Sequence, residues 1–227
     1  MIIYGKQVVL YVLEKYPSLI NEVIFSKKID DKVFSKFLKL GLKILKVDNQ
    51  KAQAMANGGN HQGFFLDINI PEQSHLKYIK DMNFILVLDG LTDMGNIGAI
   101  VRSAYSLGVE SVIITGIKDL KIENVIRSSS GALLDMPYVV VPNALDVANE
   151  LSQVGFSLLG ADMDGDDVKN FDRQGKKIAL FLGSEGRGLS NKVVKKLNHK
   201  LSIKMANNFD SLNVSVAAGI LIHELRG

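Results

Sequence analysis

Cysteine and tryptophan are absent from this 227-residue sequence, and proline and histidine occur only four times each. A chain without cysteine forms neither a disulfide framework nor a thiolate metal site. We expect no metal at all, because close ligand spacing is also missing among the four histidines, which are His61, His75, His199 and His223. No apolar run reaches the roughly 18 residues of a membrane span, and the first residues lack the pattern of a secretory signal. The sequence therefore predicts a cytoplasmic protein that has no membrane partner.

A strong excess of one charge is missing as well, since the net charge is only +3, but the charges are unevenly spread. Residues 1–80 contain twelve lysines and seven acidic residues, whereas residues 81–227 contain fifteen basic and seventeen acidic ones. A basic first part suggests a surface that grips a polyanion beside a chemical module. Lysine-rich helix faces that point into water explain the same pattern, and charge alone favours this second interpretation.

Helical and strand-like patterns alternate along residues 1–70 and predict a small α/β domain. The expected helices lie within residues 5–16, 31–41 and 49–59, and the expected strands within residues 21–26, 42–47 and 63–70. Residues 71–81 are polar and begin with a proline, so they are predicted to form a linker.

Residues 82–227 repeat this alternation, with boundaries between the elements that are marked more clearly, and predict a second domain. The expected strands are residues 84–90, 111–116, 137–141, 156–163, 177–183 and 200–205, and the expected helices are residues 96–108, 122–134, 144–155, 191–197 and a final one from about residue 214. Strands that are apolar on both faces imply a mostly parallel sheet with helices on both faces. Ligands of such sheets bind at the carboxyl ends of the strands. The final helix is apolar nearly all round, so it is expected to be buried on most sides.

Polar residues and glycines gather in three loops at expected strand ends, LDGLTDMGNIGAIVRSA, FLGSEGRGLS and IKMANNFDSLNVS. In the first loop, Asn96 is either a helix N-cap or a site residue. Arg102 lies opposite the apolar face of the same helix and is either a solvated arginine or a phosphate contact. Arginine is scarce in this chain, with five residues against 22 lysines.

The second loop has a G-x-x-G-x-G spacing, which fits neither a dinucleotide fingerprint nor a Walker loop. Its glycines let the backbone approach a ligand closely, and Glu185 between two of them is either a plain turn residue or a functional one. In the third loop, Ser211 and Asn213 stand at the mouth of the final helix. Capping explains one of these polar residues but not the whole cluster.

Together, the three loops resemble the motifs of the SpoU family of RNA ribose 2′-O-methyltransferases, within the SPOUT superfamily. Asn96, Gly98 and Arg102 match the first motif, FLGSEGRGLS matches the second, and DSLNVSVAAG matches the third. The resemblance covers about residues 82–227. In the first part, YGKQVVLYVLE and HQGF are similar to members that carry a small ribosomal-protein-like RNA-binding domain. Such members methylate a guanosine ribose of 23S rRNA.

The resemblance implies a C-terminal trefoil knot in the sheet, S-adenosyl-L-methionine as cofactor and an obligate homodimer. The catalytic residues that it implies are Asn96, Arg102, Glu185, Ser211 and Asn213. The cofactor contacts that it implies are Gly183, Ser184, Gly188, Ile203, Met205, Leu212 and Asn213. The expected RNA contacts are Arg102 and the lysines Lys6, Lys27, Lys28 and Lys32.

By this resemblance, Arg102 contacts the target phosphate and ribose, and it either serves as the base or positions the ribose. Asn96 and Asn213 orient the ribose and Arg102. Glu185 fixes the second loop and is a candidate for contact with the arginine of that loop or with RNA. Ser211 shapes the mouth of the final helix. One stretch departs from the family pattern, since MANNFD (residues 205–210) stands where related sequences usually have glycine or a charged residue.

Three rival functions remain open. The first is the same chemistry on tRNA, which the first domain argues against because the tRNA-modifying branch lacks it. The second is a non-catalytic RNA-binding or ribosome-assembly protein, which the intact motif residues argue against. The third is a nucleotide-dependent oxidoreductase, which is disfavoured because the glycine spacing is wrong and the ribose-binding acid is missing.

Overall fold

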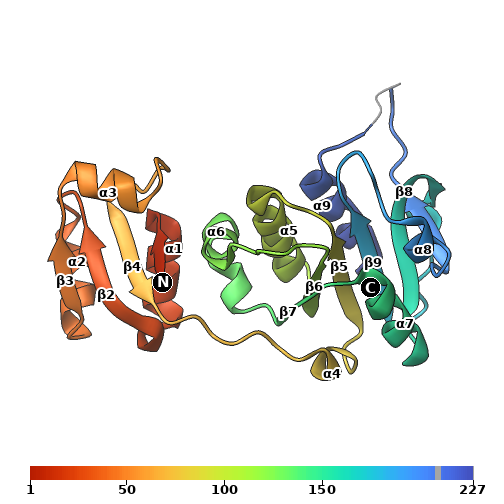
Figure 1. Ribbon diagram of the computed structural model, residues 1–227, viewed down its shortest axis with the longest axis horizontal. Coiled ribbons are helices and arrows are strands. Elements are labelled where there is room, and N and C mark those ends of the chain that lie inside the picture. The colour runs from red at the N-terminus through yellow and green to blue at the C-terminus, as the bar shows by residue number, and fades with distance from the viewer. Residues whose placement is uncertain (208–210, 227) are drawn as a thin grey trace. The chain divides into compact units, whose positions relative to one another are not determined.

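The protein, in a computed structural model that describes residues 1–207 and 211–226, divides into two units (Figure 1). The first unit consists of Met1–Glu72 and Lys121–Gly131, and the second of Gln73–Leu120 and Ala132–Gly227. Each unit has its own sheet and its own cluster of buried apolar side chains. The predicted alternation of helices and strands is present in both units.

The sheet of the first unit has four strands, in the spatial order β1 (Ile2–Tyr4), β4 (Phe64–Ile68), β2 (Ile20–Phe25) and β3 (Lys43–Lys46). Strand β4 is antiparallel to β1 and β2, whereas β2 and β3 are parallel. The helices are α1 (Lys6–Lys15), the 3₁₀ helix η1 (Pro17–Leu19), α2 (Asp31–Lys39), α3 (Asn49–Met55) and α6 (Ile122–Ser128). The six elements predicted in this part are confirmed. Strand β1 escapes prediction because three residues are too few for a periodic pattern.

Helix α6 comes later in the chain and is shorter than the helix predicted there. It ends at Ser128, because Ser130 and Gly131 have φ angles of 56° and 95°, which no α-helix contains. It packs on β1, and the guanidinium carbon of Arg127 lies 4.9 Å from the ring centroid of Tyr4. A cation over an aromatic ring is attracted by the ring quadrupole, so this contact helps to join the helix to the first unit.

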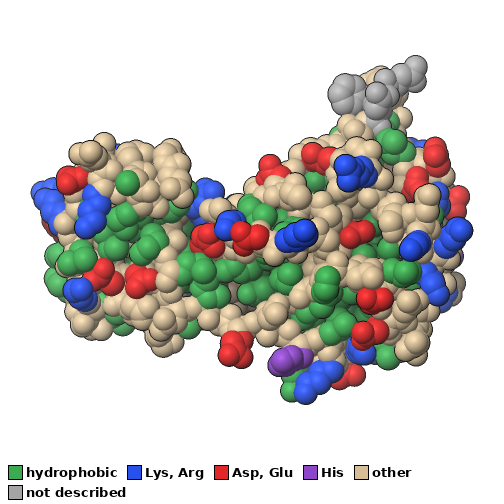
Figure 2. Space-filling view, viewed as in Figure 1, with side chains coloured by type: hydrophobic (Ala, Val, Ile, Leu, Met, Phe, Trp, Pro, Cys, Tyr) green, Lys and Arg blue, Asp and Glu red, His purple; other side chains and the backbone are tan. Residues whose placement is uncertain are grey.

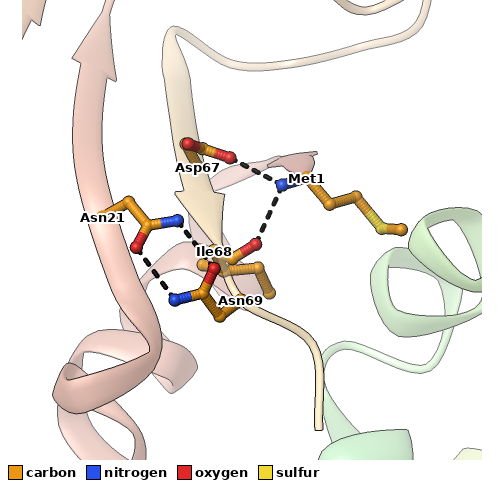
Figure 3. Close-up of polar contacts among 5 residues, drawn as sticks. All are labelled: Met1, Asn21, Asp67, Ile68 and Asn69. Carbon is orange, nitrogen blue, oxygen red and sulfur yellow. Dashed lines mark hydrogen bonds and ion pairs between the residues drawn. The ribbon is translucent and has the colours of Figure 1, made fainter. Parts of the chain in front are cut away.

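Two sets of polar contacts hold β4 between its neighbours (Figure 3). The Met1 ammonium donates to Asp67 Oδ1 at 2.6 Å and to the Ile68 carbonyl oxygen at 2.9 Å. The side chains of Asn21 and Asn69 exchange two hydrogen bonds of 3.1 Å. The first set ties the start of β1 to β4, and the second ties β2 to the residue that follows β4.

His61 is a buried polar residue of the first unit, with 3% of its surface exposed. Its ring stacks on Phe65 with the centroids 4.9 Å apart, and its Nδ1 accepts the N–H of Gly63 at 3.0 Å. Its Nε2 lies 3.2 Å from the amide nitrogen of Gln53. Burial lowers the pKa of His61 from 6.5, and the charge of Lys27 lowers it further. The unit is therefore built around a neutral imidazole.

The sheet of the second unit has six strands, in the spatial order β10 (His199–Ser202), β8 (Ser157–Asp167), β9 (Ile178–Gly183), β5 (Phe84–Asp89), β6 (Ser111–Thr115) and β7 (Tyr138–Val141). All five neighbouring pairs are parallel, which confirms the predicted parallel sheet. The helices are α4 (Leu76–Ile79), α5 (Met94–Ser106), η2 (Ala132–Leu134), α7 (Ala144–Gln153), η3 (Val168–Asn170), α8 (Asn191–Val194) and α9 (Val214–Leu225).

Strands β5 and β9 form the centre of this sheet and are buried on both faces. Their side chains from Phe84 to Leu88 and from Ile178 to Leu182 are at most 2% exposed. Val87 and Phe181 belong to the same apolar cluster as Leu151 of α7. Because side chains alternate along a strand, the residues between them face the opposite side, where α5 and α9 pack together (Figure 1). Helices thus cover both faces, as predicted.

Residues 73–81, which form the later part of the predicted linker, belong to the second unit. They include α4, whose Ile79 is completely buried. Gln73 Oε1 accepts the N–H of Val140 in β7 at 2.9 Å. A polar composition with a proline does not distinguish a linker from a segment that docks on the sheet.

Helix α9 buries only one face, so the prediction that it is buried on most sides is wrong for the single chain. Its buried residues are Ala218, Leu221, Ile222 and Leu225. Val216 and Ile220, one turn apart, are 50% and 36% exposed. An all-round apolar pattern indicates an apolar environment but does not say which molecule supplies it.

Among the described residues, no helix is long and apolar enough to cross a membrane. On the face shown in Figure 2, lysine and arginine side chains of both units are interspersed with acidic ones. Mixed, solvated charge of this kind is an ordinary protein surface. The uneven charge of the sequence therefore carries no argument for a polyanion site by itself.

The buried, neutral His61 predicts a loss of stability in acid. The free energy of unfolding should fall as the pH drops below about 6.5, because the unfolded chain then binds a proton that the folded chain excludes. Urea midpoints measured between pH 5 and pH 7.5 would show this slope. It should shrink in His61→Asn, whose amide oxygen keeps an acceptor near Gly63 without titrating, and persist in His75→Asn, where the histidine is exposed. Equal slopes in all three proteins would contradict the prediction.

Candidate functional site

The carboxyl ends of β5 and β9 lie side by side, because Asp89 pairs with Gly183 in the parallel register. The strand that follows β5 in the chain, β6, lies on its other flank, so the sheet changes direction at β5. Such a switch point leaves a crevice between the loops of neighbouring strands. Here it holds a pocket of about 220 Å³, lined by Gly90, Leu91, Thr92, Asp93, Asn96, Ser184, Glu185 and Val214.

Asp93 starts helix α5 and thereby decides the role of Asn96. The Asp93 Oδ1 accepts the N–H of Asn96 at 2.9 Å, which makes Asp93 the N-cap. The side chain of Asn96 is not needed for capping. Its Nδ2 donates instead to Glu185 Oε1 at 3.1 Å, across to the loop that follows β9.

Asn96, Glu185 and Asn213 form a hydrogen-bonded cluster that joins the three loops. The Nδ2 of Asn213 donates to Asn96 Oδ1 at 3.1 Å and to Glu185 Oε1 at 3.5 Å. One carboxylate oxygen of Glu185 thus accepts hydrogen bonds from both amide nitrogens. Hydrogen bonds to an ionised acceptor are stronger than those between neutral groups, so the carboxylate holds the orientation of both asparagine side chains.

Asn213 is at the same time the N-cap of α9. Its Oδ1 accepts the N–H of Ser215 at 2.9 Å and the hydroxyl of Ser215 at 2.6 Å. Because the amide oxygen is occupied by Ser215, the amide nitrogen must face Asn96 and Glu185. One residue therefore caps the helix and completes the cluster, so capping and a site role are not alternatives here.

The loop after β9 is a tight turn that only glycine permits. Gly186 and Gly188 have φ angles of 81° and 63°, and the Gly188 N–H donates to the Ser184 carbonyl oxygen at 2.9 Å. A Cβ atom on Gly183 would clash with the carbonyl carbon of Gly188. This turn presents Glu185 at the edge of the pocket.

The remaining residues of the predicted catalytic set are exposed. Arg102 lies on α5, six residues beyond Asn96, and Ser211 lies two residues before Asn213. Of the predicted cofactor contacts, Ile203 and Leu212 are half-buried and Met205 is 37% exposed. Residues 208–210, which end the departing stretch MANNFD, lie outside the described residues.

The predicted RNA-binding lysines are all exposed on the first unit. Lys6 is the first residue of α1, Lys27 and Lys28 follow β2, and Lys32 lies in the first turn of α2. Exposure makes them accessible to RNA, but it is equally typical of lysines that only contact water.

Two residues that shape the cluster were not predicted, Asp93 and Ser215. Asp93 shows the ordinary N-cap signature, an acidic side chain three residues before the residue whose N–H it accepts. Asn96, three residues further on, carries the same type of capping side chain, so the local pattern alone does not choose between the two. Ser215 has no distinctive sequence signal, because its effect depends on the side-chain rotamer of Asn213.

Within residues 1–207 and 211–226, no three His, Asp or Glu side chains converge in a way that could hold a metal ion. The polar side chains that line the pocket are the hydroxyls of Thr92 and Ser184, the carboxylates of Asp93 and Glu185, and the carboxamide of Asn96. The carboxamide of Asn213 is joined to them through Asn96 and Glu185. This arrangement is suited to orienting a polar substrate by hydrogen bonds.

Comparison with known families covers almost the whole chain. The model of the SpoU rRNA methylase family matches residues 83–223. A second model, described as RNA 2′-O ribose methyltransferase substrate binding, matches residues 2–74.

Individual proteins are similar over most of their length. The 23S rRNA (guanosine-2′-O-)-methyltransferase RlmB of Ralstonia nicotianae is 33% identical over 90% of this chain and 86% of its own length. An uncharacterized tRNA/rRNA methyltransferase of Borreliella burgdorferi is 32% identical over 82% of this chain and 87% of its own. The crystal structure of the SpoU methyltransferase AviRb from Streptomyces viridochromogenes, in complex with AdoMet, aligns with a TM-score of 0.80 at 24% identity. It covers 99% of this chain and 88% of that one, and it supports the fold.

Replacing the cap of α5 is expected to weaken the second unit. Asp93→Ala should lower the free energy of unfolding by about 1 kcal/mol, because the N–H of Asn96 loses its acceptor. Asp93→Asn, which keeps a capping oxygen, should lie close to the wild type. Urea unfolding of the three proteins would measure the difference, and an Asp93→Ala protein as stable as the other two would show that the cap contributes nothing.

Proposed function

Because this chain belongs to the SpoU rRNA methylase family, we propose that it transfers a methyl group from S-adenosyl-L-methionine to the 2′-hydroxyl of a ribose in RNA. The observation that carries the proposal is the cluster of Asn96, Glu185 and Asn213 beside the pocket at the switch point of the sheet. These three residues come from the three motifs by which the family is recognised. A decayed, non-catalytic relative would have no need to keep them joined.

The RNA that we propose as substrate is 23S rRNA, with a guanosine ribose as the target. The full-length relative from Ralstonia nicotianae carries this activity in its name, and the substrate-binding model matches the first unit. The alternative is a tRNA, since the relative from Borreliella burgdorferi is described as acting on tRNA or rRNA. RNA-binding modules placed before a catalytic domain favour a large, folded RNA.

The second unit offers main-chain groups that suit the cofactor. We assign its adenine and ribose to the backbone of Gly183, Ile203 and Leu212, with Ser184, Gly188, Met205 and Asn213 as further contacts. Two observations support this assignment: Gly183, Ile203 and Leu212 are half-buried rather than fully buried, and Ser184 lines the pocket. When bound, the sulfonium group of the cofactor supplies an electrophilic methyl carbon.

A ribose hydroxyl is a weak nucleophile and needs help to lose its proton while the new O–C bond forms. We propose that Arg102 contacts the phosphate and ribose of the target nucleotide. Its guanidinium is normally too basic to take part as a neutral base, so its role is to position the ribose and to stabilise the charge on the oxygen. Holding the hydroxyl in line with the methyl carbon is itself a large contribution to the rate.

Glu185 acts on its neighbours rather than on the proton. Its Oε1 already accepts hydrogen bonds from the amides of Asn96 and Asn213. Glu185 serves as the anchor that holds the carboxamide of Asn96 at the pocket, where Asn96 orients the ribose. Asn213 holds Asn96 and Glu185 in place, and Ser211 shapes the mouth of the loop.

We further propose that the enzyme is a cytoplasmic homodimer with a trefoil knot in its C-terminal segment. The exposed pair Val216 and Ile220 on α9 supports the dimer, since an apolar helix face exposed to water is stabilised when a second copy covers it. The close fit to the fold of a SpoU methyltransferase supports the knot.

The test is methyl transfer from labelled S-adenosyl-L-methionine to unmodified 23S rRNA and to bulk tRNA in parallel, followed by mapping of the 2′-O-methylated nucleotide. Label at one guanosine of 23S rRNA is the expected result. Label only in tRNA would keep the chemistry and change the substrate. No label in naked RNA or in ribosomal precursor particles would leave a binding protein with a silent site.

Arg102→Ala is expected to lower kcat by at least about 10²-fold, because the ribose loses the group that positions it. Arg102→Lys should recover little, since an ammonium lacks the planar fork that binds a phosphate bidentately. Single-turnover rates at saturating RNA measure the effect, with circular dichroism as the control for folding. A kcat close to that of the wild type in the alanine variant would remove Arg102 from the mechanism.

Neutralising Lys27 and Lys28 is expected to weaken RNA binding without changing cofactor binding. The Lys27→Gln/Lys28→Gln protein should lose RNA affinity, and the slope of log K against log salt should flatten by about 0.7 for each lost phosphate contact. The matched control is Lys46→Gln/Lys51→Gln, which neutralises two other exposed lysines of the first unit, in β3 and α3. An equal effect in both proteins would point to general charge attraction rather than to a defined contact.

A further inference from the structure

We infer that Arg187 binds a phosphate of the RNA strand next to the target nucleotide and so contributes to substrate affinity. This inference rests on the proposed function. It concerns a residue at the tip of the turn after β9, two positions beyond Glu185. Its guanidinium is exposed, and among the described residues no hydrogen bond or ion pair engages it.

The turn is built to hold this tip away from the sheet. Gly186 and Gly188, on either side of Arg187, both have positive φ angles, and a hydrogen bond between Gly188 and Ser184 closes the base of the turn. Gly183 lets the returning backbone at Gly188 and Leu189 pass too close for any side chain. An ordinary short connection requires none of these conditions, and each glycine costs conformational entropy on folding. The geometry therefore fixes where Arg187 stands with respect to the pocket wall.

The pocket wall explains why a positive charge is needed there. Ser184 and Glu185 line the pocket, so any RNA strand whose ribose enters it passes close to the carboxylate of Glu185. That carboxylate repels phosphate. Among the described residues no ion pair joins it to Arg187, and its Oε1 accepts hydrogen bonds from Asn96 and Asn213. The guanidinium is left available to offset the repulsion and to bind a phosphate through two parallel N–H groups.

An arginine at position 187 is better explained by phosphate binding than by a role as a solvated surface cation. Lysine supplies most cations of this chain, 22 of 27, and arginine occurs five times. Arg173 shows the use of arginine as a structural group, since its side chain donates to the carbonyl oxygens of Asn83 and Lys176. Arg187 makes no such structural hydrogen bond among the described residues. It differs from the exposed lysines in its position beside the pocket.

The test compares Arg187→Ala, Arg187→Lys and Arg187→Glu with the wild type in the full-length protein, using the RNA that the wild type methylates. Arg187→Ala should raise the KM for RNA about tenfold, while kcat and the affinity for S-adenosyl-L-methionine stay unchanged. Arg187→Lys should recover part of the loss and Arg187→Glu should exceed it. The salt dependence of RNA binding should flatten in Arg187→Ala by about the amount of one phosphate contact.

Lys192→Ala is the matched control, because Lys192 is an exposed cation on α8 only five residues away. A KM for RNA that is unchanged in Arg187→Ala, or raised equally by Lys192→Ala, overturns the inference. A loss of cofactor affinity without a change in RNA affinity overturns it as well, since the guanidinium would then serve the other ligand. If the wild type methylates no RNA, it is the proposed function that has failed, and the comparison of variants then uses RNA binding alone.

Discussion

The pairing of β5 with β9 is the constraint on which the rest of the second unit depends. Both strands are apolar and almost fully buried, so they can only lie at the centre of a sheet that is covered on both faces. Their parallel register sets Asp89 beside Gly183 and thereby brings two loops to the same edge. A shift of one residue would turn every buried side chain to the other face, so burial itself protects the geometry of the site.

The site is assembled by helix starts as much as by strand ends. Asp93 caps α5 and leaves the amide of Asn96 available, and Asn213 caps α9 with its oxygen while its nitrogen joins Asn96 and Glu185. Orphan N–H groups at helix starts must be satisfied in any case. The protein uses that requirement to orient two carboxamides, which are then rigid before a substrate arrives. Preorganised polar groups of this kind need no reorganisation during the reaction.

The two units place their polar groups differently. The first has a mixed sheet, a buried neutral histidine and polar ties at the ends of its strands, all of which serve stability. The second concentrates its glycine-bearing turns and polar side chains at one edge of a parallel sheet. On the face shown in Figure 2, charge does not separate the two units clearly, because cations and anions are mixed on both. Function is therefore better argued from particular side chains than from the net charge of either half.

The sequence by itself determined the alternation of helices and strands, the parallel character of the second sheet and the three loops that carry polar residues. These features depend on the periodicity of apolar residues and on glycines at the ends of helices and strands, so residues close together in the sequence are enough to predict them. Only the tertiary structure decided that Asn96 bonds Glu185, 89 residues away, and Asn213, 117 residues away. It also decided that α9 leaves Val216 exposed and that residues 73–81 dock on the sheet. Contacts between distant residues depend on the register and packing of the whole unit, and no local pattern contains them.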